Sequence, residues 1–480
     1  MDKHFRFYKH VEFCDSNIMM SVSYRHILHL AIPVTLANIV MPLQSLIDTA
    51  VVGHMQGSSQ LAGMMLAIQL LTLLLVNFNF LQYASSGLTA QAVGQYQSSA
   101  QTDANLDDDA TAPSHPLIPI LHRAILLAMV IGMVVFLTQP LTINVGLSWL
   151  GGSASAVIEA KTYLSVRLWG IVAELMNFVF LGFFAGMGKT RHMLYLQSFI
   201  AISNIILTLL LVYVFDMGLA GVALGTVIAY WLAVGLALYF ICSELTLSWR
   251  QLCYWRYDEF GGDKMLRLFS LNRDIFIRTL VLTLSFAWIT RLSAMSGDVV
   301  LAANGVLLQI LNLSAFALDG LAVAAENLSG QSHGQGNKQK FWLVVRRTGI
   351  MSHALAVMLV LFWWLGIGEY LDMMTDINAV ATLAYEYRWY AIMLPLVGVG
   401  AYWLDGIFFG MTAGKQIRQA ALMVAVLFFP LSLWLYHAFA VAGIWLSVWA
   451  LLLLRLAVLG WFLRRYRHHP FNKKQKTATQ

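Results

Sequence analysis

Charged side chains are scarce in this sequence of 480 residues. Only 11% of the residues are Asp, Glu, Lys or Arg, whereas 59% are hydrophobic. Soluble domains carry about 25% charged residues, so a soluble protein of this composition would lack the polar surface that keeps it in water. The composition therefore excludes an ordinary soluble enzyme or binding domain, and it indicates a chain that folds in a lipid bilayer.

Cysteines and catalytic motifs are equally sparse. Cys14, Cys242 and Cys253 show no paired spacing, so we expect free thiols, no disulfide and no bound metal. The sequence contains no GxSxG nucleophile elbow, no HExxH pair and no phosphate-binding P-loop. We therefore expect neither a cofactor nor an enzymatic activity, and any transport must be driven by an ion gradient unless a partner hydrolyses ATP.

Long apolar runs are what the sequence has instead. Each run is long enough to cross the hydrocarbon core as a helix, which takes about 20 residues. The prediction is an all-α integral membrane protein with twelve transmembrane helices in two lobes of six. The runs lie at 27–52, 60–85, 117–140, 160–184, 193–214, 218–243, 273–296, 300–328, 343–366, 383–410, 416–437 and 440–464.

Lys and Arg residues gather in alternate connections between these runs. The connections at 53–59, 141–158 and 367–381 contain neither residue. Because positively charged loops stay on the cytoplasmic side, the alternation predicts an even number of spans with both termini in the cytoplasm, and we expect a bacterial inner membrane. The same distribution accounts for the net charge of +6 without a nucleic-acid partner.

The runs also divide the chain into regions. The segment 244–271, which separates the two sets of six runs, is rich in Trp, Tyr and Arg, and this composition suits a linker at the cytoplasmic interface of the membrane. We expect a cytoplasmic tail at 1–22, an N-terminal lobe at 23–243, the linker at 244–271, a C-terminal lobe at 272–465 and a basic tail at 466–480.

The two lobes contain an internal repeat. The segment ASSGLTAQAVGQ at 84–95 matches AAENLSGQSHGQ at 324–335 with an offset of 240. Since six spans separate the copies, both have the same orientation, and such repeats favour alternating access around a central cavity. A channel would more often need several subunits around one pore, so we expect a monomeric transporter. A second match at an offset of 224 joins Gly182, Phe184, Gly186 and Met187 to Gly406, Phe408, Gly410 and Met411.

Asp48 is the sharpest candidate for a functional residue. It lies deep in the first run, after Pro33 and Pro42, which are potential hinges because proline weakens or kinks a helix. A charge inside the bilayer is costly, so such residues are functional candidates. Proton binding would remove the charge of a buried carboxyl and change the favoured helix geometry. The alternative is a structural carboxylate near the helix end at Gly53.

Other polar residues within the runs are weaker candidates, because many of them serve only as contacts between helices. In the N-terminal lobe we expect a cavity around Asp48 that is supported by Gln44, Asn177, Asn204, Thr208 and Thr226.

Further candidates concern the substrate and the second lobe. Met41 and Met176 could contact a bulky lipophilic cation. In the second half, Asp319 and Asp405 each precede a glycine, and Glu326 lies near a helix end, where it could instead form a salt bridge.

These motifs resemble those of the multidrug and toxic compound extrusion (MATE) family. The resemblance rests on Pro33, Pro42 and the segment Asp48–His54, on Gly87–Gln91 and on Gly182–Arg191, and it covers residues of about 22–465. Leu271–Asp274 and Leu404–Gly406 are similar to the DinF branch. The resemblance implies two six-helix lobes that face each other in a V. It also implies antiport of organic, often cationic, compounds against protons or sodium, with Asp48 as the coupling residue.

One departure from the family pattern bears on the coupling ion. Many relatives carry Asn-x-x-x-Asp in the fifth helix, but here Asn204 is followed four residues later by Thr208. Sodium would need more charged oxygen ligands, so protons are the favoured ion. The leading hypothesis is a proton-coupled efflux antiporter. The alternatives are sodium-coupled antiport, a lipid or lipid-linked oligosaccharide flippase, whose cavity would need several arginines, and an intramembrane enzyme.

Overall fold

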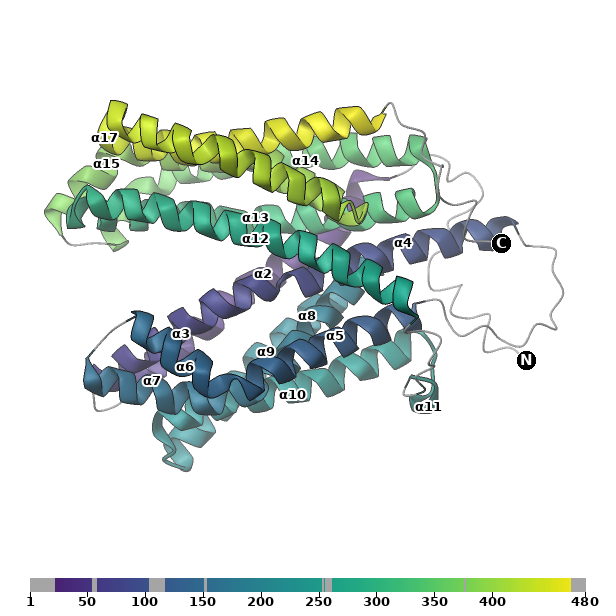
Figure 1. Ribbon diagram of the computed structural model, residues 1–480, viewed down its shortest axis with the longest axis horizontal. Coiled ribbons are helices and arrows are strands. Elements are labelled where there is room, and N and C mark those ends of the chain that lie inside the picture. Colours follow the sequence, from purple (N-terminus) through teal and green to yellow (C-terminus); the bar gives the residue numbers. More distant parts are fainter. Residues whose placement is uncertain are drawn as a thin grey trace. The chain divides into compact units, whose positions relative to one another are not determined.

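The computed structural model describes residues 22–53, 58–102, 117–150, 153–252, 254, 261–374 and 377–467, and helices make up almost all of them (Figure 1). The predicted tails at 1–22 and 466–480 lie almost wholly outside the described residues, as do seven residues of the predicted linker, namely 253 and 255–260. The all-α fold is confirmed for the part of the chain that the structure describes.

The described residues of the first half contain nine numbered α-helices. A short 3-10 turn at Val76–Phe78 joins α3 to α4, another at Leu168–Gly170 joins α7 to α8, and a π turn at Leu210–Val214 extends α9. The helices are α2 (Tyr24–Gly53), α3 (Ser58–Leu75), α4 (Phe80–Thr102), α5 (Ile118–Leu137), α6 (Gln139–Leu150), α7 (Ala154–Arg167), α8 (Ile171–Gly186), α9 (Thr190–Leu209) and α10 (Gly218–Glu244).

The linker and the second half contain fewer but longer helices. They are α11 (Trp249–Leu252), α12 (Gly262–Met295), α13 (Asp298–Gly334), α14 (Lys338–Met374), α15 (Asn378–Ile392), α16 (Leu394–Gly410) and α17 (Gly414–Arg467).

The helix lengths agree with twelve membrane spans. Nine helical segments of the described chain are long and apolar enough to cross a bilayer, and α15 with α16, bent by 42°, makes a tenth. Helix α17 has 54 residues and leaves helical geometry at Ala440 (φ 49°, ψ −122°), so it contains two spans. At 1.5 Å per residue it is about 80 Å long, more than twice a hydrocarbon core of about 30 Å. Helix α2, with 30 residues, is the twelfth.

Two connections that the sequence predicts as loops are largely helical, and this part of the prediction is wrong. In the segment 141–158, α6 continues to Leu150 and α7 begins at Ala154. In the segment 367–381, α14 continues to Met374 and α15 begins at Asn378. Hydropathy marks where the hydrocarbon ends, but a helix satisfies its own backbone hydrogen bonds and can continue into the interface.

Contacts divide the chain into two compact units. Residues Leu36–Phe269 belong to the first unit, and Ser270–Gln480 together with Val22–Thr35 belong to the second. The boundary at Phe269 falls inside the segment 244–271, whereas α2 changes unit between Thr35 and Leu36. Helix α2 is therefore shared, although its backbone is helical throughout.

The first part of α2 is held by the second unit through apolar contacts and one hydrogen bond. Ile27 and Ala31 belong to a buried cluster with Leu321 of α13. The Thr35 hydroxyl donates to the carbonyl oxygen of Ala317 at 3.3 Å. The buried side chains of this part of the helix thus pack against the second unit.

The internal repeat governs how helices cross within each unit. In the first unit, a Cβ atom added to Gly182 of α8 would lie 2.1 Å from the carbonyl oxygen of Gln82 on α4. In the second, a Cβ atom added to Gly406 of α16 would lie 2.4 Å from the carbonyl oxygen of Ala322 on α13. These pairs are related by the two sequence offsets, 224 and 240. Backbone contact explains why glycine recurs at both crossings.

Candidate functional site

Asp48 lies in the buried interior of the first unit. Its side chain is on the second part of α2 and is 6% exposed. The polar neighbours of its carboxyl are the Thr208 hydroxyl and the Gln44 side chain, and Arg167 is a neighbouring charge. Among the described residues, Asp48 Oδ1 has no hydrogen-bond partner. The predicted carboxylate is therefore buried beside polar groups from α2 and α9.

Helices α9 and α10 supply the next polar groups. The Asn204 amide donates to the Thr226 hydroxyl oxygen at 2.7 Å, and the Thr226 hydroxyl donates to the Val222 carbonyl oxygen at 3.1 Å. A Cβ atom added to Gly225 would lie 3.0 Å from Thr208 Oγ1, so the two helices touch at this point. Close packing at Gly225 thus brings Thr208, Asn204 and Thr226 to one place.

A buried ion pair from α7 and α8 completes the cluster. Arg167 Nη2 donates to Glu174 Oε2 at 2.7 Å, and both side chains are almost fully buried. The guanidinium lies over the ring of Tyr230 at 5.1 Å from its centroid. Tyr163 is a neighbour of Arg167 and an electrostatic neighbour of Asp48. The Asn177 amide donates to the carbonyl oxygens of Ala173, at 2.8 Å, and Tyr230, at 3.1 Å.

The structure therefore brings together the polar residues that the sequence predicts for the N-terminal lobe. Several of their buried atoms have no hydrogen-bond partner among the described residues, and leaving such an atom unpaired costs about 1–3 kcal/mol. Four of these six atoms are amide or carboxyl oxygens that accept hydrogen bonds, and the Thr208 hydroxyl can also accept, so the cluster is suited to a ligand that carries positive charge or donates hydrogen bonds. They are Gln44 Oε1, Asp48 Oδ1, Arg167 Nη1, Asn177 Oδ1, Asn204 Oδ1 and Thr208 Oγ1.

Sequence reasoning missed the two tyrosines of this cluster. Tyr230 lies four residues after Thr226 on α10, and Tyr163 lies four residues before Arg167 on α7. Positions four apart share one face of a helix, so this spacing is the signal that could have found them. Their rings and hydroxyls form the surroundings of the Arg167–Glu174 pair.

The remaining predictions for the first half concern methionines and prolines. Met176 is buried on α8, next to Asn177. Pro33 is buried within α2, which continues through it without a break. The side chains of Met41 and Pro42 lie outside the described residues. Contact of Met41 and Met176 with a substrate, and the hinge role of the two prolines, stay predictions.

The second unit holds a separate buried charge cluster. Asp405 Oδ2 on α16 accepts from Arg455 Nη2 on α17 at 2.5 Å and also from Arg278 Nη2 on α12. All three residues line a cavity of about 20 Å³. Asp319 on α13 is an electrostatic neighbour of Arg278 and Asp405. Two of the three candidate acids of the second lobe therefore share a cluster with two arginines.

Glu326 differs from these two acids in position. It is 2% exposed and lies eight residues before the end of α13, two helical turns beyond Asp319.

Arg278 and Arg455 were missed by sequence reasoning, although each is a charge within an apolar run, which is the same signal that points to Asp48. In the described ranges, no three His, Cys, Asp or Glu side chains gather closely enough to hold a metal ion.

Comparison with known proteins agrees with the family resemblance. The family model described as MatE matches residues 33–103, 117–210 and 275–435. The DNA damage-inducible protein F of Escherichia coli (strain K12) is 32% identical over 442 residues, which cover 91% of each chain. The chloroplastic Protein DETOXIFICATION 44 of Arabidopsis thaliana is 25% identical, over 91% of this chain and 81% of its own length.

A solved structure shares the fold. It is an outward-facing conformation of a multidrug resistance MATE family transporter of the MOP superfamily, and it has a TM-score of 0.77. The match covers 92% of this chain and 95% of that chain, at 17% identity, so this likeness concerns the fold alone.

Proposed function

This chain belongs to the MatE family, and we propose that it is a secondary active exporter that exchanges organic, lipophilic or cationic compounds for protons. The observation that carries the proposal is the state of the two acids in the buried cluster of the first unit. Glu174 is paired with Arg167, whereas the structure describes no ion pair for Asp48. Asp48 is therefore the acid that is free to exchange a proton or a cation.

The proposed cycle follows from the charge of Asp48. An ionised carboxylate attracts a cationic substrate, and protonation removes that attraction, so proton and substrate compete for one side chain. A ligand can shift a conformational equilibrium only by its differential affinity for the two states. The change in charge of Asp48 provides such a difference, because a buried charge and a buried neutral acid require different surroundings.

Helix α2 is the element that would respond. It passes from the second unit to the first between Thr35 and Leu36, two residues after Pro33. Proline lacks the backbone N–H that would hold the preceding turn, so bending there costs less than elsewhere in the helix. Residue 33 is thus the proposed hinge, and the turn containing Asp48 is the part whose position depends on protonation.

The coupling stoichiometry follows from the number of unpaired acids. With Thr208 four residues after Asn204, the cluster offers one such acid, which favours one proton per cycle and disfavours sodium. A difference of one pH unit supplies about 1.4 kcal/mol per proton, enough to concentrate a substrate about tenfold. Exchange of one proton for a monovalent cation is electroneutral and is expected to be insensitive to membrane potential.

The relatives and the charge pattern support a proposal for the location of the protein. It is a multi-pass membrane protein, and we place it in a bacterial inner membrane with both termini in the cytoplasm. This orientation rests on the alternation of basic and uncharged connections along the sequence. We propose that it works as a monomer.

The test is efflux of a fluorescent lipophilic monocation from proteoliposomes with an imposed pH gradient and no sodium. We expect transport by the wild type, no transport by Asp48→Asn, and little effect of a valinomycin-clamped membrane potential. Asp216→Asn is the matched control, because Asp216 is an exposed acid in the connection between α9 and α10.

The outcomes separate the competing functions. Equal transport by Asp48→Asn and wild type would place coupling elsewhere, and the cluster around Asp405 would be examined next. Transport that requires a sodium gradient would refute proton coupling. If the wild type moves no cation but scrambles labelled lipid, the protein is a flippase.

A further inference from the structure

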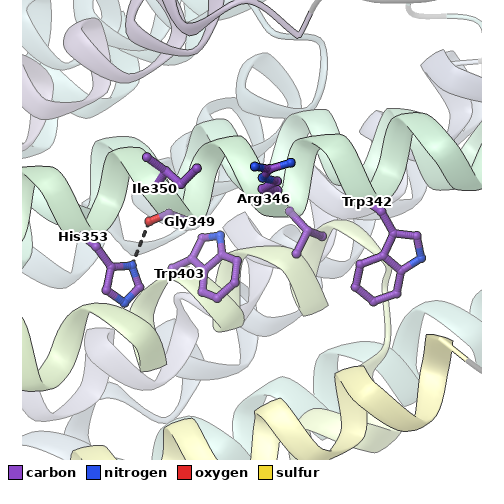
Figure 2. A pocket seen from close by; sticks show the side chains of 7 residues that line it. Trp342, Arg346, Gly349, Ile350, His353 and Trp403 are labelled. Atoms are coloured by element: carbon purple, nitrogen blue, oxygen red, sulfur yellow. Dashed lines mark hydrogen bonds between the residues drawn. The ribbon is translucent and has the colours of Figure 1, made fainter.

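The second unit has a groove along α14, and none of the residues that line it belongs to either of the two buried charge clusters described above. It has a volume of about 490 Å³ and is lined by side chains of α14 and by Trp403 of α16 (Figure 2). Its lining combines two tryptophans, an arginine and a histidine with apolar residues, and it contains no acid. We propose that this groove binds an anionic phospholipid, with the headgroup phosphate on Arg346 and an acyl chain along the exposed face of α14.

The two neighbouring arginines of α14 have different roles. Arg347 Nη1 donates to the carbonyl oxygen of Val22, and its guanidinium lies over the ring of Tyr24 at 5.5 Å. Arg346 is exposed and lines the groove, and the described residues include no hydrogen-bond or ion-pair partner for it. One arginine thus fixes the start of α2, while the other presents an unpaired positive charge to the groove.

Arg346 lies at the depth of a lipid headgroup. No Asp, Glu, Lys or Arg occurs between Arg347 and Glu369, so the arginine pair marks one end of the apolar stretch of α14. Trp342 and Trp403 flank this position in the groove, and tryptophan is enriched at the level where headgroups meet hydrocarbon. Charge and depth both match a phosphate attached to a membrane lipid.

The walls of the groove are held in place by contacts within the second unit. The Trp403 indole N–H donates to the Thr348 hydroxyl at 3.0 Å, which fixes the ring against α14. A Cβ atom added to Gly349 would lie 2.9 Å from that ring, so only glycine lets the indole lie so close. His353 Nδ1 donates to the carbonyl oxygen of Gly349 at 2.7 Å (Figure 2). The groove is therefore preformed.

Beyond the groove, the exposed face of α14 is apolar over one leaflet of the bilayer. From Ile350 to Leu365 the helix rises about 22 Å, more than half of a hydrocarbon core of about 30 Å. A lipid whose phosphate sits on Arg346 can therefore lay an acyl chain along this face. The large exposed side chains are Ile350, Val357, Met358, Leu361, Phe362, Trp364 and Leu365.

The charge at the headgroup end selects for an anionic lipid. The Arg467 guanidinium lies over the Trp342 ring at 5.7 Å, which adds a second positive charge beside the groove. A zwitterionic lipid offers the same phosphate, but its own ammonium group would lie close to these cations.

The test measures lipid binding to the full-length purified protein by native mass spectrometry in detergent. The probes are dioleoyl phosphatidylglycerol and dioleoyl phosphatidylcholine at matched concentrations. Arg346→Gln is expected to weaken phosphatidylglycerol binding about fivefold, the effect of one Lys or Arg near an anionic headgroup, and to leave phosphatidylcholine binding unchanged. Arg346 is exposed, so this substitution leaves the packing of the fold intact.

The control is Arg464→Gln, which removes an exposed arginine of the same unit outside the groove. Unchanged phosphatidylglycerol binding by this variant, with the loss in Arg346→Gln, supports the site. Wild-type-like binding by Arg346→Gln would overturn it. So would an equal loss in both variants, which indicates general attraction to basic residues, or equally tight binding of the two lipids to the wild type. None of these outcomes depends on whether the protein exports cations.

Discussion

The buried ion pair between Arg167 and Glu174 provides a quantitative test of how the site is held. We predict that Glu174→Gln destabilises the protein strongly, because it leaves a buried guanidinium that cannot lose its proton. Both side chains are almost fully buried, with exposures of 6% and 5%, and their polar atoms are 2.7 Å apart. Removing one partner of such a pair costs about 3–5 kcal/mol. Asp48 offers Arg167 only a Coulombic interaction and offsets part of this loss.

The reverse substitution is expected to cost less. In Arg167→Gln, the partner that remains is a carboxyl, which has a neutral form available, whereas a guanidinium does not, so the loss is smaller than in Glu174→Gln. The double variant leaves no buried charge at either position and should be more stable than Glu174→Gln alone. The non-additivity of the two substitutions is therefore part of the prediction.

The assay is unfolding in mixed micelles by titration with sodium dodecyl sulfate, with the thermal midpoint in detergent as a second measure. Glu244→Gln is the matched control, because Glu244 forms a pair of similar length with Lys189, 2.8 Å, at exposures of 31% and 20%. A pair of this kind contributes about 0–1 kcal/mol. The reasoning is refuted if Glu174→Gln and Glu244→Gln lose equal stability, or if the double variant loses the sum of the single losses.

Three further predictions concern the packing of the two units. Gly182→Ala and Gly406→Ala should each lower stability by at least about 1–3 kcal/mol, because a Cβ atom would overlap a carbonyl oxygen at 2.1 or 2.4 Å. Gly460→Ala is the control and should not lower stability, because a Cβ atom there has no neighbour within 4 Å. Equal thermal midpoints for all three variants would contradict the prediction. Asp405→Asn should cost about 3 kcal/mol or more, because Arg278 and Arg455 lose their shared carboxylate, and a wild-type unfolding midpoint would exclude it. Arg347→Gln should speed hydrogen exchange at the start of α2; unchanged protection there would show that the bond to Val22 is dispensable.

The spans, the family and the repeat could be predicted from the sequence because each depends on local or periodic information. A run of about 20 apolar residues must cross the hydrocarbon as a helix whatever its neighbours are. The offsets of 224 and 240 are visible in the sequence, whereas the close crossings at Gly182 and Gly406 were found only in the structure. Asp48 could be recognised as a candidate from the sequence because any charge within the hydrocarbon core of the membrane is costly.

Partner choice and the division of α2 were decided by the tertiary structure. Arg278, Asp405 and Arg455 are far apart in the sequence, and their pairing depends on the rotation and register of three helices. Tyr230 joins the Arg167–Glu174 pair for the same reason. Hydropathy is averaged along the chain and contains no information about which face of a helix meets which neighbour. The sequence by itself therefore determined which segments lie in the membrane and which residues are costly there, while packing determined which of those costs are offset.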